Sequence, residues 1–205
     1  MTEPKTIDVS HLPPYDISNQ APLWWGQLLL AAIEGMMFCI VIAAFFYVRL
    51  RMDVWPPPGD QFPPRLMPTI ALIPLFLSCI GTYWASEAAK KDDRGGMIKG
   101  LLLNLVLALA FFVFRVLDWY SLNFSYKADA FGTYIWTFLA LHSYDYVADM
   151  IFTLVLLIIA LMGKHGPKMR LGVHVDSVVW YFLVIIWVPI YVVVYWGPKL
   201  MESQQ

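Results

Sequence analysis

The sequence predicts an all-α polytopic membrane protein that folds as a bundle of five transmembrane helices. Hydrophobic residues make up 60% of its 205 positions, and charged residues make up 14%. Five apolar runs each exceed the roughly 20 residues that a helix needs to cross about 30 Å of hydrocarbon. These runs are too long and too continuously apolar for the strands of a membrane barrel, which alternate over about ten residues. We therefore expect one helical domain in a bilayer.

The expected spans lie between a polar amino-terminal segment and a short tail. Residues 1–22 lack the apolar region of a signal peptide, so we expect the first span to direct insertion. The Pro-rich residues 55–65 cannot continue a helix, and Pro74 and Pro189 predict kinks inside the second and last spans. The expected spans are residues 23–50, 66–89, 97–122, 131–162 and 173–197, within a transmembrane domain of residues 23–198 that is followed by a tail of residues 199–205.

The charges of the loops predict the orientation in the membrane. Excess Lys and Arg residues stay in the cytoplasm, so we expect the amino terminus inside and the carboxyl terminus outside. The amino-terminal side would hold Lys5, Lys90, Lys91, Arg94, Lys99, Lys164, Lys168 and Arg170, and the other side would hold Arg49, Arg51, Arg65, Lys127 and Lys199. The aromatic residues expected as interfacial anchors are Trp24, Trp25, Trp55, Trp119, Tyr195 and Trp196. No basic patch indicates nucleic-acid binding.

Ionisable side chains inside the spans are the candidate functional residues. Each costs a few kcal/mol or more when it faces lipid, so each needs a partner helix, a cavity or another protein. The candidates are Glu34, Arg115, Asp118, His142, Asp145, Asp149, His174 and Asp176. Glu34 is either a proton-responsive carboxyl or a packing residue that is protonated or hydrogen-bonded. Arg115 and Asp118 share a helix face three positions apart, which predicts an ion pair near the outer interface.

A polar stripe follows one face of the fourth span. At about 100° per residue, His142, Asp145 and Asp149 fall within an arc of roughly 60°. The stripe is either a set of metal ligands, to which Glu34 could be added, or a buried polar seam that faces neighbouring helices. Bundle metal sites normally take ligands from several helices, so we favour the seam and expect no metal.

Two further polar residues begin the last span. His174 and Asp176 are two positions apart, so they point about 160° apart on a helix and form no simple dyad. They are expected to form a solvated interfacial pair, although a specific role for either residue stays open.

Five segments in register carry the pattern of a known family. IEGMMFCIVIAAFFYVRL followed by WPPP is similar to its SEVMFF segment, and LIPLFLSCIGTYWASEAAKKDDR to its serine-containing helix. FFVFRVLDWYSL is similar to an aromatic segment that ends in Glu, ADAFGTYIWTFLALHSYDYVADM to FGSxFFxxTGxHGxHV, and HVDSVVWYFLVIIWVPIYVVVYWG to HFxDVVWxxLFxxxYxxG. The chain thus resembles subunit III of the haem–copper oxygen reductases, the cytochrome c oxidases and quinol oxidases, in its short five-helix prokaryotic form.

The resemblance places individual residues on the motifs of this family. Glu34 takes the position of its intramembrane glutamate, His142 that of the first histidine of HGxH, and His174 and Trp180 those of the His and Trp in the last motif. The sequence also departs from the pattern. Asp118 stands for a Glu, Asp145 replaces the second histidine, and Ser177 stands where the last motif has Asp, with Asp176 displaced by one. These departures indicate a divergent branch of the family.

The resemblance implies an accessory subunit that carries no catalytic residue, redox centre or metal of its own. Haem and copper would belong to partner subunits of a complex that reduces oxygen to water and pumps protons. This chain would contact subunit I directly, with subunit II and a larger respiratory supercomplex as further partners. It would bind phospholipid, for which Arg115, Trp55 and Trp119 are the candidates, in the inner membrane of a prokaryotic cell. The electron donor, cytochrome c or quinol, depends on the partner subunits.

The histidines agree with an accessory role, and other functions stay open. His11, His142, His165 and His174 are too few and too scattered to ligate two haems and a copper. The alternatives are a subunit III-like component of a nitric oxide reductase system and a stand-alone membrane metalloprotein that uses His142, Asp145 and Asp149. A small transporter or proton channel is less favoured. Such a protein is expected to have discontinuous helices or repeat symmetry, and apart from Pro74 and Pro189 the sequence offers neither.

Overall fold

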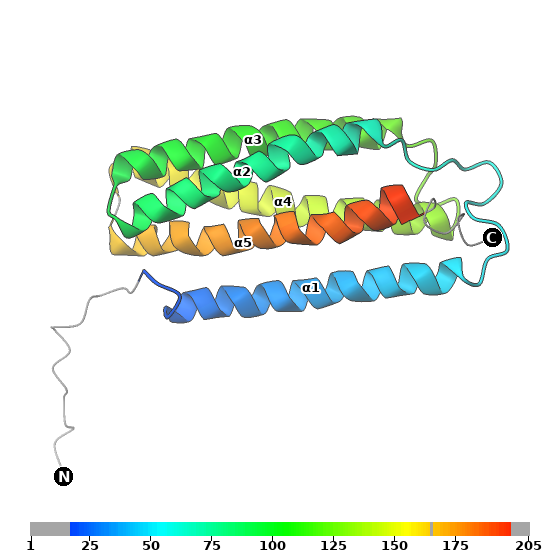
Figure 1. Cartoon of the computed structure of the whole chain (residues 1–205), viewed down its shortest axis with the longest axis horizontal. Coiled ribbons are helices and arrows are strands. Elements are labelled where there is room, and N and C mark those ends of the chain that lie inside the picture. Colours follow the sequence, from blue (N-terminus) through cyan, green and yellow to red (C-terminus); the bar gives the residue numbers. More distant parts are fainter. Residues whose placement is uncertain (1–16, 165, 198–205) are drawn as a thin grey trace, which may run out of the picture.

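The computed structural model describes residues 17–164 and 166–197, which form five long helices (Figure 1). The helices are α1 (Pro22–Arg49), α2 (Leu66–Lys90), α3 (Arg94–Ser121), α4 (Ala130–Leu161) and α5 (Pro167–Tyr191), and α5 continues into a short π-helix, η1 (Val192–Trp196). All five are long and apolar enough to cross a membrane, and the described residues contain no strand. The predicted all-α five-helix fold is confirmed. The structure does not describe residues 1–16, 165 and 198–205. These include the expected tail, residues 199–205, as well as Lys5, His11, His165 and Lys199.

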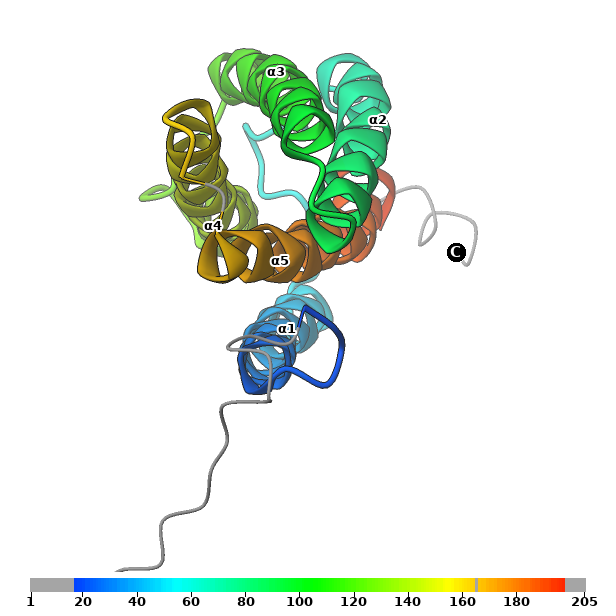
Figure 2. The same ribbon diagram turned by 90° about the vertical axis from the view of Figure 1, so that its left-hand side faces the viewer.

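Four of the helices form a closed ring, and the fifth lies outside it. Viewed end-on, α2, α3, α4 and α5 surround a common core, whereas α1 lies beyond α5 (Figure 2). Each ring helix packs against the next around the circle, most extensively α2 against α3, and α1 packs mainly against α5 and less against α4. Aromatic side chains, among them Phe111, Phe138, Trp180 and Trp187, fill the core of the ring. The position of α1 leaves a groove on each of its two sides.

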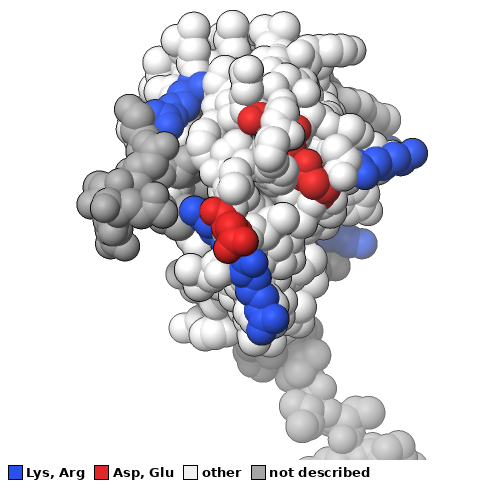
Figure 3. Space-filling view, turned by 90° about the vertical axis from the view of Figure 1, so that its right-hand side faces the viewer, with Lys and Arg blue, Asp and Glu red and all other residues white. Residues whose placement is uncertain are grey.

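Successive helices run in opposite directions, so the loops alternate between the two ends of the bundle (Figure 1). The start of α1, the α2–α3 turn and the α4–α5 turn share one end. The basic residues in or near these turns are Lys90, Lys91, Arg94, Lys99, Lys164, Lys168 and Arg170. At the other end, where α1 finishes, basic and acidic side chains are scattered among uncharged residues (Figure 3). The loops therefore fall into the two groups that the charge pattern predicted.

Charged side chains close the ends of the ring helices. Asp93 and Asp129 cap the starts of α3 and α4, accepting hydrogen bonds from the backbone N–H groups of Gly96 at 3.0 Å and Gly132 at 2.8 Å. Arg94 donates to the carbonyl oxygen of Ala160 at 2.9 Å, at the end of α4. These contacts satisfy backbone groups that a helix end leaves unpaired, and cations favour the negative ends of helix dipoles.

The last helix begins six residues earlier than expected, at Pro167 rather than Val173. Lys168 and Arg170 resemble loop residues in the sequence, but proline is well suited to the first turn of a helix. Arg170 then donates to the carbonyl oxygen of Ala89 at 2.7 Å, at the end of α2. The last expected span ends at residue 197, close to the end of η1 at Trp196 and six residues beyond the end of α5. The bounds of α1 to α4 lie within three residues of the expected spans. Pro74 and Pro189 lie inside α2 and α5, and the kinks expected there stay predictions.

Two glycines let α2 and α3 approach closely. A Cβ atom added to Gly81 would lie 2.6 Å from the backbone nitrogen of Asn104, and one added to Gly100 would lie 2.8 Å from the Cα atom of Ala85. Close backbone approach through small residues is the usual way in which helices pack in a bilayer, where no hydrophobic effect draws them together.

Replacing Gly100 with Ala should separate α2 from α3 and destabilise the bundle by about 1–3 kcal/mol, the usual cost of overpacking. The free energy of unfolding in mixed micelles measures this loss. Gly26→Ala is the matched control, because an added Cβ atom there meets nothing within 4 Å. The control should unfold as the unmodified chain does or be slightly more stable, since Ala favours a helix over Gly. Equal stability of the Gly100 variant would contradict close packing.

Asp60, in the loop between α1 and α2, lies beside Asp129 at the start of α4. Burial, followed by a hydrogen bond to Asp129 and repulsion from its carboxylate, raises the pKa of Asp60 above its ordinary value of 3.8. A raised pKa in the folded state means that protonation of Asp60 stabilises the fold. That stabilisation is fully present below the ordinary value and is lost as the pH rises through the folded-state pKa.

Asp60→Asn should therefore raise the unfolding temperature at pH 7, and its advantage should shrink and vanish as the pH falls towards 3.8. Thermal unfolding of the purified chain in a mild detergent across this pH range checks the expectation. Asp53→Asn, at an exposed position of the same loop, serves as the control for a general change in net charge. An advantage that grows in acid would show that the sign is wrong.

Candidate functional site

The centre of the ring holds a buried ion pair. Arg115 and Asp118, one turn apart on α3, are only 2% and 1% exposed, and Arg115 Nη1 lies 3.8 Å from Asp118 Oδ2. The guanidinium carbon of Arg115 lies 3.6 Å from the ring centre of Trp187, a cation–π contact. Tyr195 donates a hydrogen bond to the same carboxylate oxygen of Asp118. The ion pair that the spacing predicted is present and fully enclosed by the protein.

Tyr195 was expected at the membrane interface, and this expectation is wrong. Its side chain is 1% exposed and points into the ring from η1, whose wider π-helical turn follows α5. Arg65 fixes this turn from the next loop, because its Nε donates to the carbonyl oxygen of Tyr195 at 2.7 Å. An aromatic residue near the end of a span has the same sequence signature whether it faces lipid or the core, so the sequence does not reveal this role.

His142 belongs to the same core. Its Nε2 donates to the carbonyl oxygen of Leu183 at 3.1 Å, and its ring centre lies 4.7 Å from that of Trp187. Tyr146, one turn along α4, donates to the carbonyl oxygen of Ala108 at 3.2 Å. His142 and Tyr146 are fully buried. These contacts join α4 to α5 and α3, so both residues organise the interior of the ring.

Trp180 joins α5 to α2. Its indole Nε1 donates to Ser78 Oγ at 2.8 Å, and the Ser78 hydroxyl donates in turn to the carbonyl oxygen of Leu75 at 2.5 Å. Neither Trp180 nor Ser78 is exposed. The indole N–H, which would otherwise lack a partner inside the bundle, is thereby satisfied.

A second polar centre lies outside the ring, in a groove between α1, α4 and α5. The groove has a volume of about 400 Å³, and Glu34, Asp145, Asp149 and Asp176 all line it. Asp149 and Asp176 are buried, whereas Glu34 and Asp145 are half-buried. Thr153 donates to Asp176 Oδ2 at 3.1 Å. We call this the acidic groove.

The polar stripe on α4 therefore divides between two places. His142 points into the ring, whereas Asp145 and Asp149 line the acidic groove. Seven residues of helix rise about 10 Å, which further separates His142 from Asp149. Within residues 17–164 and 166–197, no three His, Cys, Asp or Glu side chains group closely enough to hold a metal ion. The stripe and Glu34 thus do not form a common ligand set.

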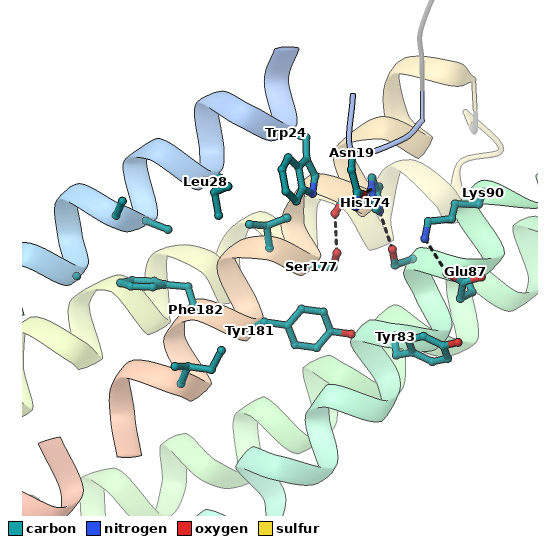
Figure 4. Close-up of a pocket in the computed structure, with 16 residues that line it drawn as sticks. Asn19, Trp24, Leu28, Tyr83, Glu87, Lys90, His174, Ser177, Tyr181 and Phe182 are labelled. Atoms are coloured by element: carbon teal, nitrogen blue, oxygen red, sulfur yellow. Dashed lines mark hydrogen bonds and ion pairs between the residues drawn. The ribbon is translucent and has the colours of Figure 1, made fainter. Parts of the chain in front are cut away.

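His174 lines a larger groove on the opposite side of α1, between α1, α2 and α5 (Figure 4). Its Nδ1 lies 2.9 Å from Ser86 Oγ, and its Nε2 lies 3.3 Å from Asn19 Oδ1. The groove has a volume of about 670 Å³ and apolar walls. His174 and Asp176 are only 5% and 2% exposed, so the expected solvated interfacial pair is wrong. The early start of α5 carries both residues inside the bundle.

The residues expected to bind lipid lie in three different environments. Arg115 is enclosed by aromatic rings, which a lipid phosphate would have to displace. Trp119 lines a mainly apolar groove of about 420 Å³ between α3 and α4. Trp55 is half-buried and packs edge-to-face against Phe45 and Phe131. A lipid-binding role for these residues stays a prediction.

Loss of a partner of Arg115 should destabilise the ring. Asp118→Asn leaves a buried guanidinium without its counter-charge, for which we expect a loss of about 3–5 kcal/mol in the free energy of unfolding. Tyr195→Phe removes one hydrogen-bond donor and should cost about 1–3 kcal/mol. Unfolding in mixed micelles measures both, with Tyr120→Phe, at a residue that is 85% exposed, as the control. A Tyr195 variant as stable as this control would refute the structural role of the hydrogen bond.

Comparison with known proteins identifies the family. A family model described as cytochrome c oxidase subunit III matches residues 11–198, nearly the whole chain. Proteins named cytochrome c oxidase subunit 3 are similar to this chain in Thermostichus vulcanus, at 24% identity over 83% of this chain and 85% of the relative, and in Triticum aestivum, at 25% over 86% and 69%. The Locusta migratoria protein of the same name is 23% identical over 85% of this chain and 68% of its own length. The chain therefore belongs to the cytochrome c oxidase subunit III family.

Proposed function

We propose that this chain is the accessory, non-redox subunit III of a respiratory haem–copper terminal oxidase. The observation that carries the proposal is the family match over residues 11–198, on a bundle of five helices that can each cross a membrane. In the complex, the chain packs against subunit I and stabilises it, with subunit II and a larger respiratory assembly as further partners. The complex reduces oxygen to water and pumps protons.

The environments of the two described histidines support a role without a redox centre. The Nε2 atom of His142 is bound to the carbonyl oxygen of Leu183, and both ring nitrogens of His174 face protein partners. The His142 ring is fully buried against Trp187, and His174 is 5% exposed, so a haem iron would have to displace surrounding side chains to reach either imidazole. Haem and copper accordingly reside in the partner subunits, where electron transfer and oxygen chemistry take place.

The distribution of basic residues supports the orientation that we propose for this multi-pass membrane protein. Lys90, Lys91, Arg94, Lys99, Lys164, Lys168 and Arg170 lie in or near the turns at the end where α1 begins. Excess basic residues stay in the cytoplasm, so this end faces the cytoplasm and the other end faces outwards. The membrane is the inner membrane of a prokaryotic cell.

The groove beside His174 supports phospholipid binding. Its walls are formed by apolar side chains such as Leu28 and Phe182, which suit an acyl chain. One end carries Lys90, Asn19 and His174, whose polar groups suit a headgroup (Figure 4). The groove lies at the end of the bundle where α1 and α5 begin and α2 ends. A lipid would therefore place its headgroup near the membrane surface and its tail along α1 and α5.

Copurification tests the proposal as a whole. The chain, isolated from its native membrane in a mild detergent, should carry an oxidase subunit I with it, and the visible spectrum should show haem in the complex. Removal of the chain should leave a subunit I that loses activity faster during turnover than the intact complex. Isolation of the chain with no haem protein would overturn the proposal.

Filling the groove tests lipid binding separately. Ala32 lines this groove, so Ala32→Trp should displace bound phospholipid and lower the amount that copurifies at least twofold, as measured by lipid mass spectrometry. Ala43→Trp makes the same change at an exposed position of α1 that does not line it. Equal phospholipid content in the two variants, with the complex intact in both, would place the lipid elsewhere without touching the assignment as subunit III.

A further inference from the structure

The acidic groove contains an imbalance of charge that the described chain does not resolve. Four carboxyl groups line it, and no Lys or Arg among residues 17–164 and 166–197 does. They come from three helices: Glu34 from α1, Asp145 and Asp149 from α4, and Asp176 from α5. Carboxylates at membrane depth normally pair with a cation, receive hydrogen bonds or hold a proton.

Asp149 shows that the groove is incomplete. Its side chain is only 6% exposed, lines the groove, and has no hydrogen-bond partner for Oδ2 among the described residues. Asp145 Oδ2 likewise has no partner there. Asp176 accepts a hydrogen bond from Thr153 and also shares one with the Asp149 carboxyl group, so it is the Oδ2 atom of Asp149 that lacks a partner. A buried polar atom without a partner costs about 1–3 kcal/mol, and more when it is charged. The Oδ2 atoms of Asp145 and Asp149, in side chains that line the groove, therefore provide acceptor positions for a donor that enters it from outside the chain.

The depth of these carboxyls decides which donors can reach them. Asp145 lies at the middle of α4 and Glu34 near the middle of α1, with Asp149 one turn further along α4. At 1.5 Å per residue, all three lie within about 6 Å of the midpoints of their helices. Lipid headgroups lie about 15 Å from the centre of the hydrocarbon. A headgroup amine at the membrane surface therefore does not reach these three carboxyls, although the groove extends to Leu23 at the start of α1. A side chain of a membrane-spanning helix does reach them.

The volume of the groove limits what enters it. A single turn of helix occupies roughly 500 Å³, from a diameter of about 11 Å and a pitch of 5.4 Å. The groove, at about 400 Å³, accommodates one long side chain and not a helix. Leu30, Tyr144 and Phe152 line it as well and are 47%, 75% and 45% exposed, so they offer apolar surface to the helix that carries this side chain.

We infer that the acidic groove binds a Lys or Arg side chain from a transmembrane helix of another polypeptide. The helix lies against the outer faces of α1 and α4, and its cation pairs with Asp149, Asp145 and Glu34. The described part of a second copy of this chain does not supply the cation, because each Lys or Arg in it lies in a loop or within six residues of a helix end. This inference rests on the groove alone and does not depend on which complex the chain joins.

Photo-crosslinking in native membranes tests the inference. A benzophenone amino acid at position 144, where Tyr144 lines the groove, should crosslink to an apolar peptide that contains Lys or Arg. The combined substitution Glu34→Gln and Asp149→Asn should lower the yield at least fivefold. Asp53→Asn, which neutralises an exposed carboxylate in the loop between α1 and α2 outside both grooves, should leave it unchanged. The same probe at position 106, on an exposed part of α3, controls for non-specific labelling.

Exchanging the charges of the two partners distinguishes an ion pair from simple proximity. Replacing the Lys or Arg of the captured peptide with Glu should abolish the crosslink, and Asp149→Lys in this chain should restore it. Each variant is compared at equal amounts of folded chain, judged by gel filtration in mild detergent. The inference is overturned if the probe labels only lipid, a second copy of this chain or a peptide without a basic residue. A yield that survives neutralisation of the carboxyls also overturns it, because the groups would then hold protons instead of a partner.

Discussion

The enclosure of Arg115 determines much of the architecture. A guanidinium keeps its charge in proteins, and a charge inside a bilayer needs a counter-charge and hydrogen-bond partners within the protein. Asp118 supplies the charge from the same helix, and Tyr195 bonds to Asp118 from the far end of the chain. Trp187 covers the guanidinium. These side-chain contacts connect α3 with α5 and η1 across the ring, where Tyr195 reaches Asp118 from the π-helical turn.

Much of the fold could be predicted from the sequence, because the lengths of the apolar runs match the thickness of a bilayer and the Pro-rich loop cannot continue a helix. The ion pair of Arg115 and Asp118 could equally be predicted, since it depends only on spacing within one helix. The start of α5 was missed because Lys168 and Arg170 resemble loop residues, although Arg170 in fact binds the end of α2. That contact depends on tertiary structure, which a local sequence pattern does not describe.

The polar stripe on α4 shows a second limit of sequence reasoning. Helical periodicity correctly placed His142, Asp145 and Asp149 near one face, but a face of a helix in a bundle can border two different neighbours. His142 meets α5 inside the ring, and the two aspartates meet the groove beside α1. This division follows from where α1 packs, which periodicity does not reveal.

The position of α1 outside the ring links the two grooves geometrically. Both grooves have α1 as one wall and α5 as another, on opposite sides of the same contact. A sideways shift of α1 towards α4 would narrow the acidic groove and widen the one beside His174, and a shift towards α2 would do the reverse. The occupants of the two grooves are therefore not independent. A ligand or side chain that fills one groove changes the space available in the other, because α1 forms a wall of both.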